Sequence, residues 1–150
     1  MSRAITENTQ SIGSLLRITQ AAMVQKYGNW LATSPYNDIQ PAHASALQPL
    51  WQRREGVRLT ELAQIARITK QSMGALVDSL EASGYVERLD DPDDGRAWRV
   101  RLTARGRSFG RDVRKFAREM DAWIEEQIGT EKFKTFRSAL QDLVASLQED

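Results

Sequence analysis

The chain has 150 residues, of which 41% are hydrophobic and 27% charged, the composition of an ordinary globular domain. It has no cysteine and one histidine, His43, which excludes disulfides, zinc fingers and thiol redox chemistry and leaves almost only carboxylates for a metal site. The longest uncharged run, 39–52, is too short and too polar to span a bilayer, and residues 1–10 lack the apolar core of a signal peptide. We therefore expect a single-domain cytoplasmic protein over residues 1–150 that needs no cofactor.

The small net charge of +1 hides a partition along the chain. Residues 1–50 carry 3 basic and 2 acidic groups, residues 51–118 carry 15 and 10, and residues 119–150 carry 3 and 8. A middle of +5 followed by an end of −5 is typical of a chain in which one region meets a polyanion and another does not. Charge blocks of this size are also common on solvated faces, so the partition alone assigns no function.

The N-terminal third is predicted to be helical. Apolar residues near helical spacing indicate a first helix from about Thr9 to Leu31, and residues 34–38 then form a turn. Pro41 suits the first position of a second helix that reaches Arg53. Pro49 should kink or shorten this helix.

Two short helices with almost no connection predict a helix-turn-helix. Thr60 suits the N-cap of a helix over residues 61–66. Thr69 suits the N-cap of a second helix over residues 70–83, which Gly84 ends. Only two residues separate the first helix from the second N-cap, which forces the helices to cross sharply.

A β-hairpin is predicted next, with strands over residues 85–89 and 97–102. The connection, 90–96, is dense in turn formers and charges, so the hairpin should protrude as a wing. Apolar and basic side chains alternate in the second strand, namely Trp98, Val100 and Leu102 against Arg99 and Arg101.

The C-terminal part returns to helical periodicity, with a break at Gly129 and a last helix capped by Thr130. Each helix carries a heptad-like apolar seam. The seams are Phe109, Val113, Phe116, Met120 and Trp123, then Phe133, Phe136, Leu140, Leu143 and Leu147. We expect residues 9–33 and 105–148 to be dimerisation helices around a winged helix-turn-helix at 41–104. The predicted fold class is mainly α with a small β-hairpin wing.

This order of elements resembles the multiple-antibiotic-resistance regulator (MarR) family of winged helix-turn-helix transcription regulators. The resemblance covers nearly the whole chain and is strongest from Val57 to Gly106, and the wing pattern at its family spacing is its most specific part. The stretches that carry it are Leu59-Thr60-Glu61-Leu62-Ala63, Thr69-Lys70-Gln71-Ser72 through Leu80-Glu81, Gly84-Tyr85-Val86-Glu87-Arg88, Asp91-Pro92-Asp93-Asp94-Gly95-Arg96, Leu102-Thr103 and Gly106.

The start of the second helix of the helix-turn-helix is the expected base-reading element. A helix fits the major groove, and its N-terminal residues reach base edges. Here these residues are Thr69, Lys70, Gln71 and Ser72. Lysine can donate to guanine, glutamine can pair with adenine, and the hydroxyls can reach a base or a phosphate. The alternative is an ordinary capped surface helix.

The wing is the second expected DNA contact. Arg96 resembles the family arginine that enters the minor groove, and Asp94 resembles the carboxylate that orients the wing. Gly95 replaces a second arginine common at this point, which indicates a weaker or more flexible wing. Arg99, on the basic face of the second strand, completes the predicted DNA-binding set. The alternative is a solvated turn.

The long helix after the wing carries a basic face opposite its apolar seam. This face consists of Arg107, Arg111, Arg114 and Arg118. These residues can meet DNA phosphates, pair across a dimer with carboxylates, or remain a solvated face. The candidate carboxylates are Glu119, Asp121, Glu125 and Glu126.

The resemblance implies a homodimeric transcription regulator, a repressor that binds double-stranded DNA at an inverted repeat and responds to a small aromatic effector. A pocket for the effector can draw on Trp30, Tyr36, His43 and Trp51, each of which also fits an ordinary core or surface role. A non-specific architectural nucleic-acid binder and a helical protein-interaction module are the alternatives. The sequence has no glycine-rich phosphate loop, no nucleophile–histidine pair and no metal cluster, so we do not expect an enzyme.

Overall fold

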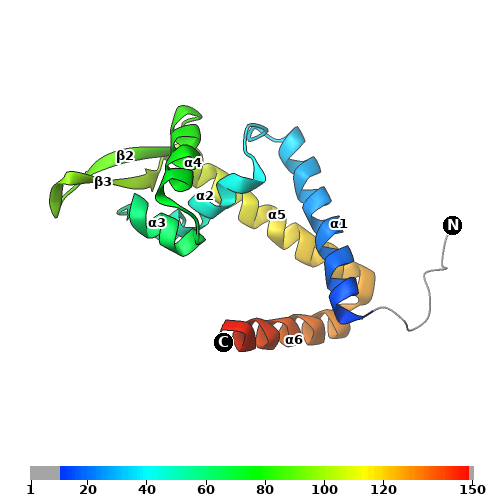
Figure 1. Cartoon of the computed structure of the whole chain (residues 1–150). Coiled ribbons are helices and arrows are strands. Elements are labelled where there is room, and N and C mark those ends of the chain that lie inside the picture. Colours follow the sequence, from blue (N-terminus) through cyan, green and yellow to red (C-terminus); the bar gives the residue numbers. More distant parts are fainter. Residues whose placement is uncertain (1–10, 149–150) are drawn as a thin grey trace. The chain divides into compact units, whose positions relative to one another are not determined.

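The computed structural model describes residues 11–148 and consists of helices with one small antiparallel sheet, as predicted (Figure 1). The chain divides into two compact units, the first ending at Ala44 and the second beginning at Ser45, and each is described by itself. The predicted start of the first helix at Thr9 and the expectation about a signal peptide fall outside the described residues. Among the described helices, none combines the length and the apolar character needed to cross a membrane.

The first unit contains helix α1, Ile12–Thr33. Ser11 is its N-cap, because the Ser11 hydroxyl oxygen accepts a hydrogen bond from the Ser14 amide at 3.2 Å. Its C-terminal end lies two residues beyond the predicted Leu31, and Ser34 caps it. Several apolar side chains of α1 are exposed, namely Ile12, Leu15, Leu16, Ile18 and Val24.

The predicted helix from Pro41 to Arg53 is wrong in extent. Pro41 occupies the first position, but of a short 3-10 helix, η1, Pro41–His43, and helix α2 follows as Ala44–Leu50. Pro49 lies in the last turn of α2, and without an amide hydrogen it cannot bond to the carbonyl one turn earlier. The helix therefore ends at Leu50, three residues before the predicted end.

The helix-turn-helix is present as helices α3, Leu59–Ala66, and α4, Lys70–Ala82. Arg67 adopts a left-handed conformation (φ 54°) that ends α3 and turns the chain toward α4. Thr69 caps α4 as predicted, whereas the prediction that Thr60 caps α3 is wrong. The helix already begins at Leu59, with Arg58 in the N-cap position and no side-chain cap.

The sheet has three strands in the order β1-β3-β2, all antiparallel. Strands β2, Val86–Asp91, and β3, Asp94–Leu102, form the hairpin, and both run further into the wing than predicted. The third strand, β1, Val57–Arg58, was not predicted, because two residues are too few to show an alternating pattern. Val57 pairs with Val100, and both side chains are buried.

The long helix α5, Ala104–Ile128, packs through two glycines against Tyr85, just before β2, and against Trp51, just after α2. A Cβ atom on Gly106 would lie 2.2 Å from the carbonyl oxygen of Tyr85, and one on Gly110 would lie 2.7 Å from Nε1 of Trp51. Because neither residue has a Cβ, the helix backbone approaches both neighbours closely. Phe109, between them, packs edge-on against the buried ring of Tyr85 at 5.9 Å between centroids.

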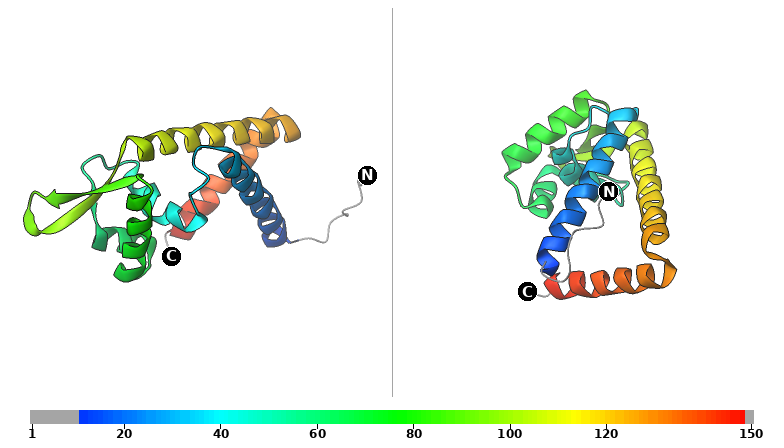
Figure 2. Two further views of the ribbon diagram at one scale, coloured as in Figure 1. Left: turned by 90° about the horizontal axis from the view of Figure 1, so that it is seen from above. Right: turned by 90° about the vertical axis from the view of Figure 1, so that its right-hand side faces the viewer.

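Helix α5 begins and ends at recognisable caps. Thr103 is its N-cap and accepts a hydrogen bond from the Gly106 amide at 3.2 Å. Gly129 ends it with a φ of 86°, and helix α6, Thr130–Gln148, continues in another direction (Figure 2). Thr130 is thus the first helical residue, and the prediction that it is the cap is wrong. An apolar stripe on these helices is exposed, namely Ile128, Phe136, Leu143, Val144 and Leu147.

We predict that Gly106→Ala lowers the free energy of unfolding by at least about 1–3 kcal/mol, because its methyl group would overlap a backbone carbonyl that cannot move independently of the sheet. Gly74→Ala is the matched control. Gly74 is also helical, but its Cβ would meet only a Leu59 methyl group at 4.0 Å, so this change should raise stability by about 0.5–1 kcal/mol. Urea unfolding of both variants measures the difference, and equal effects would contradict the packing described.

His43 is predicted to make stability depend on pH. It is buried, its Nδ1 accepts a hydrogen bond from the Gln40 amide at 3.1 Å, and burial lowers its pKa below the ordinary 6.5 despite nearby Asp38. Below pH 6.5 the unfolded chain takes up a proton at this histidine more readily than the folded chain does. As the pH falls below 6.5, the free energy of unfolding should therefore decrease by less than about 1.4 kcal/mol per pH unit.

The measurement is urea unfolding at pH 7.5 and pH 5.5 for the wild type and His43→Gln. Because the chain has no other histidine, the variant should lose most of the pH dependence in this window. If the free energy of unfolding of the variant depended on pH as much as that of the wild type, carboxylates and not His43 would cause the dependence.

Candidate nucleic-acid interface

The first turn of α4 is exposed and organised by its cap. The Thr69 hydroxyl accepts a hydrogen bond from the Ser72 amide at 3.1 Å and donates one to the Ser72 hydroxyl at 2.9 Å. Both hydroxyls are therefore engaged in holding the helix start. Lys70 and Gln71, between them, are exposed and have no hydrogen-bond or ion-pair partner within residues 11–148. The cap thus presents one ammonium group and one amide outward.

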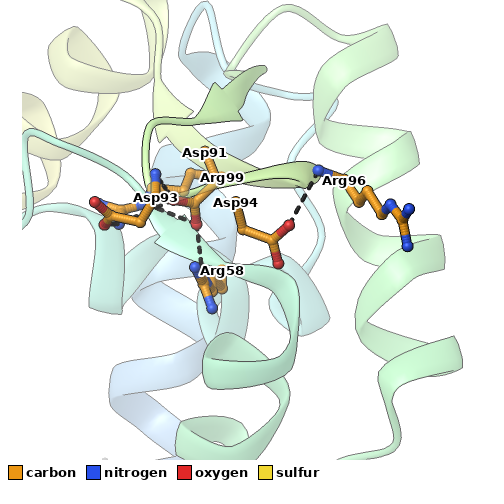
Figure 3. A network of polar contacts seen from close by, with 6 residues as sticks. All are labelled: Arg58, Asp91, Asp93, Asp94, Arg96 and Arg99. Atoms are coloured by element: carbon orange, nitrogen blue, oxygen red, sulfur yellow. Dashed lines mark hydrogen bonds and ion pairs between the residues drawn. The ribbon is translucent and has the colours of Figure 1, made fainter.

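Arg96, at the tip of the wing, is also exposed and, within the described residues, has an unpaired side chain, as Lys70 and Gln71 do. The carboxylate of Asp94 accepts a hydrogen bond from the Arg96 amide at 3.1 Å, which fixes the backbone of the turn. The Arg96 side chain extends away from the carboxylates of the wing (Figure 3). Its guanidinium group makes no ion pair with any described residue. Asp94 therefore orients the backbone of Arg96 without neutralising its charge.

A groove of about 310 Å³ brings the helix-turn-helix and the wing together. It lies between the starts of α3 and α4 and strand β3. Its lining residues are Arg58, Leu59, Thr60, Lys70, Arg96, Ala97 and Trp98. Lys70 and Arg96, which are 26 positions apart in the sequence, thus face one concave surface that carries uncompensated positive charge.

The wing is held by the buried carboxylate of Asp91, the last residue of β2, which lies beside the turn of the hairpin (Figure 3). Asp91 Oδ2 lies 2.5 Å from Nε of Arg58 in β1 and 3.2 Å from Nε of Arg99 in β3. Its Oδ1 accepts a hydrogen bond from the Asp93 amide at 2.9 Å. The bonds from Arg58, Asp93 and Arg99 hold the pKa of this carboxyl well below its ordinary value, although burial opposes them. A shift in strand register between Asp90 and Asp91 accompanies this inward position.

The structure places Arg99 differently from the other predicted DNA-binding residues. Its guanidinium group contacts the carboxylates of Asp91 and Asp93, the latter at 2.9 Å, and its side chain is only 22% exposed. A group already paired with two carboxylates gains less from a phosphate than a free one does. Arg101 is likewise paired, with Glu87 directly opposite on β2 at 2.7 Å. The basic face of β3 is therefore largely neutralised within the sheet.

Arg88 joins the wing to α4. Its guanidinium group forms ion pairs with Asp78 and Glu81 on α4 and lies over the ring of Trp98, 4.5 Å from the centroid. Trp98 in turn lines the groove between helix and wing. This arrangement fixes one wall of the groove relative to α4.

Arg58 and Asp91 were not predicted to take part in the interface. Arg58 lies on a strand too short to detect, and Asp91 is one of several carboxylates in a charged turn. No local pattern distinguishes a buried aspartate from its exposed neighbours. Their contact joins positions 33 residues apart, and only the pairing of β1 with β3 brings them together.

The residues considered for an effector pocket divide between the two units. Trp30, Tyr36 and His43 belong to the first, where the rings of Trp30 and Tyr36 lie 6.5 Å apart. Trp51 belongs to the second and packs on Phe109 at 6.3 Å. An effector site that combines them stays a prediction.

Comparison with known proteins agrees with this arrangement. A MarR family model matches residues 38–97, which include the helix-turn-helix and most of the wing. The HTH-type transcriptional regulator BilQ of Clostridioides difficile (strain CD3) is 22% identical over 95 residues, 61% of this chain and 64% of that protein, so the match spans less than two thirds of this relative's length.

Two solved structures share the fold over most of their length. MepR, a transcription regulator of the Staphylococcus aureus multidrug efflux pump MepA, has a TM-score of 0.76 at 21% identity, covering 92% of this chain and 99% of that one. FabT of Streptococcus pneumoniae, solved in complex with DNA, has a TM-score of 0.75 at 22% identity, covering 90% and 93%. Residues 38–97 thus match the MarR family model, and the chain shares the fold of these two solved structures.

Proposed function

We propose that this protein is a homodimeric, cytoplasmic transcription regulator that binds double-stranded DNA at an inverted repeat and acts as a repressor. The observation that carries the proposal is the groove in which Lys70 and Arg96 meet without a carboxylate partner. One cation comes from the recognition helix and the other from the wing, the two elements that a winged helix-turn-helix applies to adjacent grooves of DNA. FabT, which shares the fold, has been solved with DNA.

The groups divide by chemistry into base-reading and backbone-directed groups. Gln71 offers an amide that can pair with one base edge, and Lys70 can donate to guanine. Arg96 offers a charge to the narrow minor groove, whose potential depends on shape more than on base identity. Thr69 and Ser72 hold the helix start, whose exposed amides favour a phosphate. We propose that Arg99 supports the wing through Asp91 and contributes less to DNA contact.

We predict that Gln71→Ala and Arg96→Ala weaken DNA binding in different ways. An operator is first selected from a random duplex library with the wild-type protein. Gln71→Ala should then cost about 1–3 kcal/mol on this operator and little on scrambled DNA, since it removes a directional base contact. Arg96→Ala should also weaken binding, and the affinity of this variant should depend less on salt than that of the wild type. Its loss of affinity should be greatest on sites with A·T-rich flanks.

Salt titrations of each variant on both duplexes make the measurement, and Gln141→Ala, an exposed glutamine on α6, is the control. Equal affinity of the wild type for operator and scrambled DNA would favour the non-specific architectural alternative. If neither substitution changed operator affinity, the helix and wing would not be the DNA contacts, and the protein-interaction alternative would replace the proposal.

The dimer is proposed from exposed apolar side chains on the terminal helices. Leu143 and Leu147 are 44% and 67% exposed in the single chain, and α1 exposes a further apolar set. A second copy would bury these surfaces, and its two-fold axis would set two recognition helices about one DNA turn apart. We predict a dimer in sedimentation at micromolar concentration and a shift toward monomer in Leu143→Glu. A monomeric wild type would contradict the proposal.

A further inference from the structure

A second groove, of about 460 Å³, lies in the same unit and shares no lining residue with the groove between helix and wing. It is formed by the end of α2, the loop that follows, the end of β3 and the first turns of α5. The residues that line it are Leu50, Trp51, Arg53, Arg54, Leu102, Arg107, Arg111 and Arg114. Five of these eight are arginines, and none is acidic.

Four of these arginines make no ion pair within the described part of the chain, namely Arg54, Arg107, Arg111 and Arg114. Arg107 donates to the carbonyl oxygen of Leu102 at 2.7 Å, and Arg111 donates to the Ser108 hydroxyl at 2.7 Å. Both are therefore positioned by neutral acceptors that leave their charge uncompensated. Only Arg53, paired with Glu61, has a carboxylate partner.

Arginines on the three-stranded sheet are neutralised by carboxylates of this same chain. There Arg58, Arg88, Arg99 and Arg101 all form ion pairs with carboxylates. The chain has 20 acidic residues for 21 basic ones, so acidic residues are not scarce. On α5, Arg107, Arg111 and Arg114 nevertheless follow one another at spacings of four and three positions, at which like charges destabilise a helix. A bound anion would remove this repulsion.

The floor of the groove is ordered and apolar. Leu50 and Leu102 are buried, and the Trp51 ring lies against α5 because Gly110 has no side chain. The indole Nε1 is buried and has no hydrogen-bond partner in the described residues. The arginines around this floor are exposed, and the planar geometry of their guanidinium groups matches the oxygens of a phosphate.

From this geometry we propose that the arginine groove is a binding site for a phosphate-type oxyanion with two or more negative charges. The proposal is independent of DNA binding by α4 and the wing. A phosphate group can come from a free small molecule or from the backbone of DNA, and the two sources predict different behaviour.

The first experiment uses isothermal titration of the full-length protein with sodium pyrophosphate, at an ionic strength held constant with sodium chloride. The double variant Arg111→Ala/Arg114→Ala removes two of the four unpaired cations. Arg118→Ala is the matched control, because Arg118 lies on the same face of α5, is exposed and does not line the groove. We expect wild type and Arg118→Ala to bind pyrophosphate equally and the double variant to bind on the order of tenfold or more weakly.

The second experiment distinguishes the sources. If the site takes a DNA phosphate, the double variant should weaken binding to any duplex and lower the slope of log affinity against log salt by about one to two, and pyrophosphate should compete with DNA. If the site takes a free anion, DNA affinity without pyrophosphate should be the same in the double variant and in Arg118→Ala.

Two results would overturn the proposal. One is equal pyrophosphate affinity in the double variant and the control, which would show binding that depends on overall charge alone. The other is no pyrophosphate binding to the wild type, together with loss of dimer in the double variant. In that case the arginines would pair with carboxylates of a second copy. Thermal unfolding of both variants without ligand checks that they are folded, and their exposed positions predict that they are.

Discussion

The buried carboxylate of Asp91 is the interaction on which the wing depends. It connects β1 through Arg58, β3 through Arg99 and the turn of the hairpin through the Asp93 amide. Such a carboxylate pays a large desolvation penalty, which only several charged and hydrogen-bonded partners can offset. Removal of the carboxylate would leave Arg58 without its carboxylate partner and Arg99 with Asp93 alone, beside the turn of the hairpin. A hairpin of two strands has little stability of its own, so this connection to β1 determines where the wing lies.

The connection also determines which arginines remain available. Arg58 and Arg99 form ion pairs with Asp91 and Asp93, whereas Arg96 is held only through its backbone amide by Asp94. Carboxylates near a phosphate-binding surface would normally weaken it by repulsion. Here Asp91 and Asp93 form ion pairs with Arg58 and Arg99, and Asp94 contacts only the backbone amide of Arg96, so no carboxylate of the described residues forms an ion pair with the Arg96 guanidinium group. The same acidic turn thus supports the wing and leaves its outermost cation unpaired.

The sequence was sufficient to predict those parts of the fold that depend on neighbouring residues. The cap at Thr69 and the stop at Gly84 involve residues within a few positions of each other, and their chemistry is local. Thr60 was assigned wrongly by the same logic, because β1 leads directly into α3 and starts the helix one residue before it. A residue that can cap a helix does not by itself start one, and here the preceding strand β1 determined where α3 begins.

The interface was predicted in part. Lys70, Gln71 and Arg96 are exposed as expected, since helix starts and turn tips are surface positions. The pairing of Arg99 with Asp91 and Asp93 was not foreseeable, because it depends on the register shift beside Asp91, where the Asp91 side chain is turned inward. A two-residue alternation predicts faces of a strand only while the register is regular.

Helix α5 relates these features to one another within the second unit. Gly106 lies against the Tyr85 carbonyl, which also accepts a hydrogen bond from the Thr103 amide at 3.0 Å, so the start of α5 is fixed to the sheet at backbone level. One turn later, Gly110 fixes it to Trp51. Backbone contacts of this kind allow less adjustment than contacts between flexible side chains. The direction in which α5 leaves the sheet, and with it the position of the arginines on its outer face, therefore follows from the absence of two methyl groups.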